Sequence, residues 1–367
     1  MNEMLMSDKN KTTIDACRFC WMCRHICPIG NVTGQERNNA RGRALSLSMI
    51  CRGMEYSRDM VENVYECALC GACTKDCVTG FDPVEFTKSA RLEAVLEGLT
   101  PDYIMKMADN IEATGNPYGE TTISKTLSDE IKSLSNQSET LLFLGADARY
   151  KSPESALNAI KLLKKAKVSV TLLADEPDSG YCMDVLFSKT DETKSIMQKA
   201  ANVLSSFKTV IAYDPADAKV FLREYKEWGI ELTPTVKTFT SYINELIQSN
   251  TISPKKSDKT VVFQDPSLLS RDLEETDEAR AVLKICANTK EMLLHGKHTM
   301  WAGSLIMNEY MPEVMKMTAA ARWKNALSAG ADALVTASPS EYELLGKVKP
   351  ESMELYSIEE IVLGGLE

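Results

Sequence analysis

The chain has 367 residues, a formal net charge of -10, a hydrophobic fraction of 44% and a charged fraction of 26%. This composition is typical of a soluble globular protein with two or three domains. The acidic excess argues against a nucleic-acid surface, because phosphate binding needs clustered lysine and arginine. No apolar stretch reaches the roughly eighteen residues that cross a bilayer. We therefore expect a cytoplasmic protein without a transmembrane segment, which meets a membrane only through a partner.

One cysteine motif occurs twice near the start of the chain. The spacing C-x2-C-x2-C-x3-C is typical of proteins with two cubane clusters, in which the fourth cysteine of each run ligates the cluster of the other run. The first run comprises Cys17, Cys20, Cys23 and Cys27, and the second comprises Cys67, Cys70, Cys73 and Cys77. We therefore predict two [4Fe-4S] clusters. One would be held by Cys17, Cys20, Cys23 and Cys77, and the other by Cys67, Cys70, Cys73 and Cys27.

Zinc and disulfides are the alternatives to this interpretation. A tetrahedral zinc site needs only four ligands, whereas each run offers four thiols in close succession. Disulfides belong to secreted chains, and no signal-peptide pattern is seen at the start of this one. Cys51 lies between the runs without a second thiol nearby, and we expect it to be a small buried hydrophobic residue.

The cysteine runs lie in a unit predicted to be mainly α-helical, over residues 1–115. Residues 38–66 favour a helix, a second helix is expected from about residue 82 to 98, and Thr100 and Pro101 have the pattern of an N-cap followed by a first helical residue. Residues 116–137 are predicted to be a connector, because this stretch is rich in serine, threonine, asparagine and glycine.

The remaining sequence alternates between strand and helix patterns. Strands are predicted at 141–144, 168–173 and 209–212, and helices follow Ser152 and cover about 191–207. This alternation predicts parallel sheets covered by helices. A weak repeat at an offset of roughly 120 residues indicates two similar α/β modules, 138–250 and 258–367. In both, a strand ends at an N-cap followed by proline, with Asp214 in the first module and Ser338 in the second.

The whole chain from about Cys17 resembles a family of iron-sulfur subunits. The family includes the D subunit of heterodisulfide reductase, the glycolate oxidase iron-sulfur subunit, the lactate-utilisation iron-sulfur protein and the C subunit of anaerobic glycerol-3-phosphate dehydrogenase. The segments that carry this resemblance beyond the cysteine runs are 115–119, 263–271 and 329–339. The resemblance implies an α+β multidomain protein, in which an N-terminal α-helical dicluster ferredoxin domain precedes two tandem α/β cysteine-rich-type modules.

The chain departs from this family in its two modules, where most of the expected cysteines are missing. The matching positions are Ala146, Gly180-Tyr181-Cys182, Asp214, Asp217, Ser267, Ser338 and Glu341. Only Cys182 and Cys286 remain in this half of the chain. The departure indicates modules that have lost a metal and kept their fold, because aspartate or serine can cap a helix where a thiolate once stood. His295 and His298 are interpreted as a polar surface turn, although two imidazoles at this spacing can begin a metal site.

The favoured function is an electron-transfer subunit and not an enzyme in its own right. The sequence shows no nucleophile-and-base pattern and no glycine-rich nucleotide loop, whereas cubane clusters exchange single electrons. The resemblance implies an FAD-containing dehydrogenase or oxidase of the 2-hydroxy-acid or polyol type as partner, with an electron-transferring flavoprotein as a further candidate. Two alternatives stay open: a heterodisulfide or thiol reductase subunit with a metal in the C-terminal half, and an iron-sulfur sensing or docking module.

Overall fold

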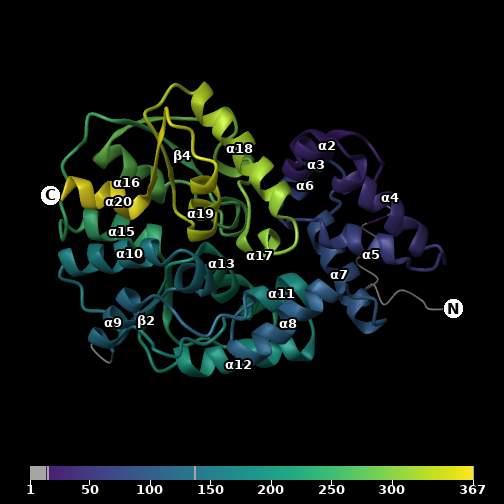
Figure 1. Cartoon of the computed structure of the whole chain (residues 1–367), viewed down its shortest axis with the longest axis horizontal. Coiled ribbons are helices and arrows are strands. Elements are labelled where there is room, and N and C mark those ends of the chain that lie inside the picture. Colours follow the sequence, from purple (N-terminus) through teal and green to yellow (C-terminus); the bar gives the residue numbers. More distant parts are fainter. Residues whose placement is uncertain (1–13, 15, 136–137, 367) are drawn as a thin grey trace.

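The fold is taken from a computed structural model, which describes residues 14, 16–135 and 138–366. The remaining positions include the start of the predicted N-terminal unit and the end of the predicted connector, and both lie outside the described residues. The described chain combines a helical N-terminal region with two parallel sheets, which confirms the predicted fold class (Figure 1). None of the helices in the described ranges is both long and apolar enough to span a bilayer.

The N-terminal region consists of short helices joined by loops. Its elements are α2 (Met22–Ile26), α3 (Pro28–Thr33), η1 (Glu36–Asn38), α4 (Ala40–Ile50), α5 (Arg58–Tyr65), α6 (Ala72–Lys75), α7 (Pro83–Leu96), α8 (Asp102–Thr114) and α9 (Lys125–Ser133). Three expectations need correction. The helix predicted over 38–66 is broken between α4 and α5, where Gly53 has a φ of 94° and Ser57 caps the new helix. Pro101 itself is the N-cap of α8, and the connector contains α9, capped by Ser124.

The first module contains a three-stranded sheet in the order β1-β2-β3, with all strands parallel. Its elements are β1 (Thr140–Phe143), η2 (Asp147–Lys151), α10 (Pro153–Lys165), α11 (Tyr181–Phe187), α12 (Asp191–Leu204), β2 (Thr209–Ala212), α13 (Pro215–Lys219), η3 (Val220–Glu224), α14 (Tyr225–Glu227), β3 (Thr235–Thr238) and α15 (Phe239–Gln248). The strand predicted at 168–173 is wrong, because only Thr171 pairs with β1. The ladder stops after Thr171 because Leu144 donates its backbone N–H to the carboxylate of Glu176, while the carbonyl of Leu173 accepts from Arg149.

The second module repeats this plan with a parallel four-stranded sheet in the order β5-β4-β6-β7. Its elements are β4 (Thr260–Gln264), η4 (Leu268–Asp272), α16 (Glu278–Cys286), β5 (Asn288–Lys290), η5 (Gly296–His298), α17 (Leu305–Asn308), α18 (Pro312–Ser328), β6 (Ala333–Thr336), α19 (Pro339–Lys347), β7 (Glu354–Ser357) and α20 (Ile358–Gly365). The predicted caps are confirmed: Asp214 accepts from the backbone N–H of Ala216, and Ser338 from that of Glu341.

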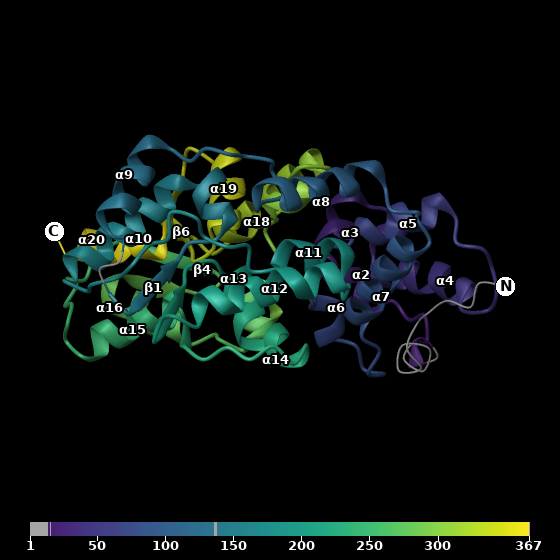
Figure 2. The same cartoon turned by 90° about the horizontal axis from the view of Figure 1, so that it is seen from below.

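The two modules are joined by a shared apolar core. Residues of α10 and α15 from the first module pack with residues of α16 and α20 from the second, including Ile160, Ile243, Val282 and Val362. Figures 1 and 2 show these helices beside the C-terminus, while the N-terminal helices α2 to α7 lie at the opposite end of the molecule. The cysteine runs therefore lie at one end of the α/β part, where α7 packs against α11 and α3 against α18.

Candidate iron-sulfur centre

The first thiol group, Cys17, Cys20, Cys23 and Cys77, lines one cavity between the two cysteine runs. Burial raises the pKa of Cys17, and the neighbouring thiols of Cys77 and Cys20 raise it further. Cys20 is exposed to solvent, whereas the other three are partly covered. The last cysteine of the second run thus lies among the first three of the first run.

The second thiol group, Cys27, Cys67, Cys70 and Cys73, is more deeply buried. Burial raises the pKa of Cys73 well above its ordinary value, and the thiols of Cys67, Cys70 and Cys27 add to the effect. Burial also raises the pKa of Cys70 to about 11. Cys73 lines the cavity of the first thiol group as well, so the two groups are adjacent. The structure thus brings together four thiols in each group.

The backbone of the two runs is bent in the same way at equivalent positions. Phe19 and Leu69 each lie two residues after the first cysteine of their run, and both have a left-handed conformation, with φ values of 49° and 52°. In each case the backbone N–H donates to the sulfur of that first cysteine, over 3.4 Å. A left-handed residue with a side chain is strained, and such strain gathers at functional sites. The bend turns an amide toward each sulfur, which favours its thiolate form.

Arg43 provides the test of whether the second thiol group suits an anionic cluster. Its side chain is 4% exposed, and its Nε and Nη1 atoms have no hydrogen-bond partner among the described residues. Burial opposes its charge, but the thiols of Cys67, Cys27 and Cys73 raise its pKa. In return, although burial opposes ionisation of Cys67, Arg43 and Arg91 lower the pKa of this thiol. A buried, unpaired cation is costly unless an anion accompanies it, so the residues present fit a negatively charged iron-sulfur cluster.

Arg43 was missed by the sequence reasoning, although a signal for it exists. It lies three residues after Ala40 and four before Leu47, within the apolar stripe that α4 buries. A charged residue in such a stripe needs a partner in the core.

Two further arginines join the modules to the second thiol group. Arg91 is fully buried and donates to the carbonyl of Cys67 at 2.6 Å and to that of Val185 at 2.5 Å, at the end of α11. Arg271 of η4 donates to the carbonyl of Cys70 at 2.7 Å. Arg91 of α7 thus joins the carbonyl of Cys67 to the first module, and Arg271 of the second module holds the carbonyl of Cys70.

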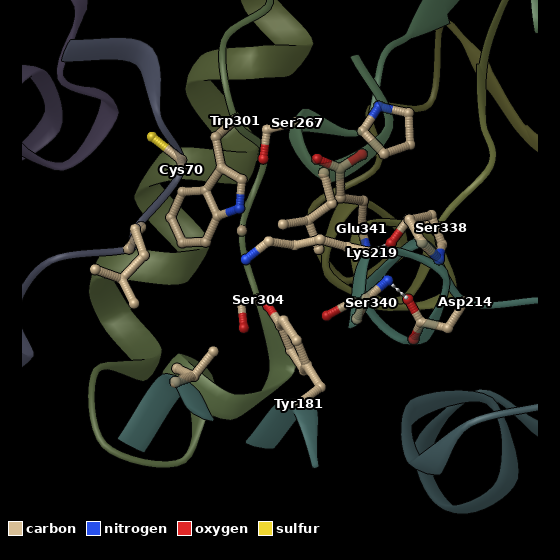
Figure 3. A pocket seen from close by; sticks show the side chains of 18 of the residues that line it. Cys70, Tyr181, Asp214, Lys219, Ser267, Trp301, Ser304, Ser338, Ser340 and Glu341 are labelled. Atoms are coloured by element: carbon tan, nitrogen blue, oxygen red, sulfur yellow. Dashed lines mark hydrogen bonds between the residues drawn. The ribbon is translucent and has the colours of Figure 1, made fainter. Parts of the chain in front are cut away.

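Between this group and the modules lies a cavity that we call the junction pocket (Figure 3). Cys70 forms part of its wall. Several positions where the family resemblance places cysteines also line it, namely Asp214, Ser267, Ser338 and Glu341. Ala146, Tyr181, Cys182, Asp214 and Asp217 line an adjoining cavity. The replaced positions of both modules thus gather at the carboxyl ends of β1, β2, β4 and β6.

Of the other candidate residues, the two cysteines are buried within the fold and the two histidines lie beside the second cysteine run. Cys182 and Cys286 are 6% and 1% exposed and belong to different apolar cores. His295 contacts the carbonyl of Met292, and His298 faces Asp76 at 3.5 Å. In the part of the chain that the structure describes, no three histidine, cysteine, aspartate or glutamate side chains converge on a single metal ion. The thiolates of a cubane bind different iron corners, so they stand further apart than ligands of one ion.

The comparisons with known proteins point to the same centre. Residues 13–81 match the family model described as a 4Fe-4S dicluster domain. The chain is 24% identical to the D subunit of dihydromethanophenazine:CoB--CoM heterodisulfide reductase from Methanosarcina acetivorans, over 89% of this chain and 87% of that protein. It is 29% identical to a probable membrane-anchored ferredoxin of Chromohalobacter salexigens, over 61% of this chain and 35% of that protein.

A crystal structure of a hypothetical protein from Helicobacter pylori has a similar fold, with a TM-score of 0.52 at 12% identity, covering 99% of this chain and 73% of the other. The fold and the cysteine runs together define an electron-transfer iron-sulfur protein with an N-terminal 4Fe-4S dicluster domain. Within that class, the chain is similar to the D subunit of heterodisulfide reductase, as predicted from the sequence.

Proposed function

We propose that the chain relays single electrons through two [4Fe-4S] clusters, between a flavoprotein partner and a further carrier. The first thiol group would hold one cluster and the second thiol group the other. The observation that carries this proposal is the gathering of eight thiols into two adjacent groups. Bound clusters would supply one-electron chemistry, and the chain's own residues would set their potentials and their distance from solvent.

The surface beside Cys20 supports exchange of electrons with another protein at the first thiol group. Trp21 and Met22 are 50% and 51% exposed, and Val78 is 80% exposed. Arg24 and Arg41 lie over the ring of Trp21, at 4.8 and 4.5 Å from its centre. Exposed aromatic and apolar side chains next to arginine are typical of protein interfaces. By the family resemblance, the partner would carry FAD and oxidise a 2-hydroxy acid or a polyol.

Thiol or disulfide reduction in the C-terminal half is less well supported. The relative from Methanosarcina acetivorans is named for a heterodisulfide, but thiol exchange needs an accessible thiolate. Burial raises the pKa of Cys182 well above its ordinary value, and raises that of Cys286 to about 11. Since these two thiols lie in separate cores, they do not form a reactive pair.

The proposal is tested by counting reducible clusters in anaerobically purified protein by electron paramagnetic resonance. We expect two spins per chain after reduction with dithionite, and reduction by the flavoprotein expressed with the chain. Cys77→Ala should remove one of the two signals, whereas the matched variant Cys182→Ala should keep both. A single signal in the unmodified protein, or intact clusters that take no electrons from the reduced flavoprotein, would refute the relay.

A further inference from the structure

The junction pocket is closed by all three parts of the chain. Its walls come from the loop before α6, from the ends of strands in the first module and from the second module, and they enclose a cavity of about 50 Å³. A cavity of this size holds a few water molecules or one small ligand. In open α/β sheets, ligands bind outside the carboxyl ends of the strands, which is where this pocket lies.

Three hydrogen-bond donors that face this pocket have no partner among the described residues. Trp301 and Ser267 are 6% and 3% exposed, and neither the indole N–H nor the hydroxyl forms a hydrogen bond with any described residue. The hydroxyl of Tyr181 likewise has no partner in the described part of the chain. Figure 3 shows these three groups directed into the pocket. An indole N–H can only donate, so inside the pocket it needs an acceptor from water or from a ligand.

A cation lies among these donors. Figure 3 shows the side chain of Lys219 extending into the pocket toward Trp301. Its ammonium forms an ion pair with Glu224 at 2.9 Å, which occupies only part of its donor capacity. Burial opposes the charge of Lys219, but Asp272, Glu224 and Asp184 raise its pKa, so the side chain stays charged. The second lysine of the wall, Lys88, is paired with Asp184 at 2.7 Å.

The acidic residues of the wall repel an anion less than their number suggests. Burial raises the pKa of Asp147 and of Asp214, and that of Glu341 to about 7. Their carboxyls are also occupied within the fold: Asp214 accepts from the N–H of Ala216, and Glu341 accepts from Gln264, Thr336 and Ala302. Asp184 is held by its ion pair with Lys88. The indole, the hydroxyls and the ammonium that face the pocket are thus available to donate, and the complement of converging donors is an oxyanion.

We propose that the junction pocket binds a small organic carboxylate, held by the indole N–H of Trp301, the hydroxyls of Ser267 and Tyr181, and the ammonium of Lys219. The planar carboxylate offers two oxygens, enough acceptors for these donors. The ligand would lie beside Cys70, so its binding would change the electrostatic environment of the second thiol group. This site goes beyond the relay of electrons and requires no flavoprotein.

The test is isothermal titration calorimetry of the anaerobic holoprotein with oxalate, pyruvate and lactate. Lactamide, which lacks the charge, and inorganic phosphate, which is not planar, are the comparison compounds. We expect saturable binding of at least one carboxylate and at least tenfold weaker binding of lactamide and phosphate. Ser267→Ala and Trp301→Phe should each weaken carboxylate binding about tenfold, because each removes one donor from a charged acceptor. Lys219→Gln should weaken it further.

Matched variants separate the pocket from general effects on the fold. Trp323→Phe removes an indole N–H that donates to the carbonyl of Leu345, and Lys226→Gln removes an exposed charge near Lys219. Both should leave the affinity unchanged. If Lys219→Gln does not fold, Ser267→Ala and Trp301→Phe decide the question. The proposal is overturned if no carboxylate binds saturably, if lactamide or phosphate binds as tightly, or if both of these variants keep the original affinity. The titration measures no electron transfer. A negative binding result therefore does not refute the proposed electron relay, and failure of the relay does not refute carboxylate binding.

Discussion

Replacing Arg43 by methionine should lower the reduction potential of one cluster and spare the other. Arg43 is buried, and its charge acts on the thiols of Cys27, Cys67 and Cys73. A reduced cluster carries one more negative charge than an oxidised one, so a nearby cation favours reduction. At a separation of about 5 to 10 Å and an effective dielectric constant of about 20, one unit charge contributes about 1.7 to 3.3 kcal/mol. For one electron, this corresponds to about 70 to 140 mV.

The assay is a redox titration followed by electron paramagnetic resonance, which resolves the two clusters. We expect the potential of one signal to fall by that amount in Arg43→Met and to be largely restored in Arg43→Lys, which keeps the charge. Arg58→Met removes an exposed arginine of the same region and should shift neither signal by more than a small fraction of this, because solvent screens it. Unchanged potentials in Arg43→Met, or equal shifts of both signals, would refute the placement of Arg43 beside one cluster only.

Three further predictions follow from contacts elsewhere in the chain. Burial raises the pKa of Glu359 to about 7, so the folded chain holds a proton that the unfolded chain releases between about pH 4.5 and 7, and stability falls as pH rises through this window. Between pH 5.5 and 8, the loss of stability amounts to about 2 kcal/mol. The difference in Tm between these two pH values should therefore shrink in Glu359→Gln and stay unchanged in Glu351→Gln, which alters an exposed residue. Equal differences in the unmodified protein and both variants would contradict the argument. Arg271→Gln should speed the removal of iron by a chelator, because the second module then no longer holds the carbonyl of Cys70. A rate equal to that of the unmodified protein would show that this contact does not protect the centre. Trp21→Ala should slow electron exchange with the flavoprotein at an unchanged spin count. Ile285→Ala should not, because this side chain is 40% exposed on α16, at the opposite end of the molecule from the cysteine runs. Equal rates in both variants would place the docking surface elsewhere.

Much of the fold could be predicted because the signals are local. The strand predicted at 209–212 is β2 to the residue, and the N-caps Asp214 and Ser338 lie where proline follows a polar residue. These features depend on a few neighbouring residues, since a cap or a buried strand is set by local chemistry. The cysteine spacing is local too, and the assignment of each thiol to a cluster stays a prediction that the spin count will test.

The features that escaped prediction depend on contacts between distant segments. Thr171 is the only residue of its predicted strand to pair with β1, because the side chains of Glu176 and Arg149 bind the next backbone groups of the ladder. The contact of Arg271 with Cys70 joins residues 201 positions apart. Nothing in the sequence around Arg271 indicates which carbonyl it binds. Tertiary contacts of this kind override or add to local preference, so they appear only when the chain is folded.

The junction pocket also bears on why the modules persist without their expected cysteines. Retention of the fold alone accounts for Asp214 and Ser338, because both cap helices that would otherwise present unpaired N–H groups. It does not account for Ser267 or Trp301, whose donors open into the pocket and have no hydrogen-bond partner in the described part of the chain. An apolar side chain at either position would therefore lose no hydrogen bond within the described fold. The persistence of such donors beside Cys70 therefore favours a pocket kept for a ligand over a remnant kept only for its shape.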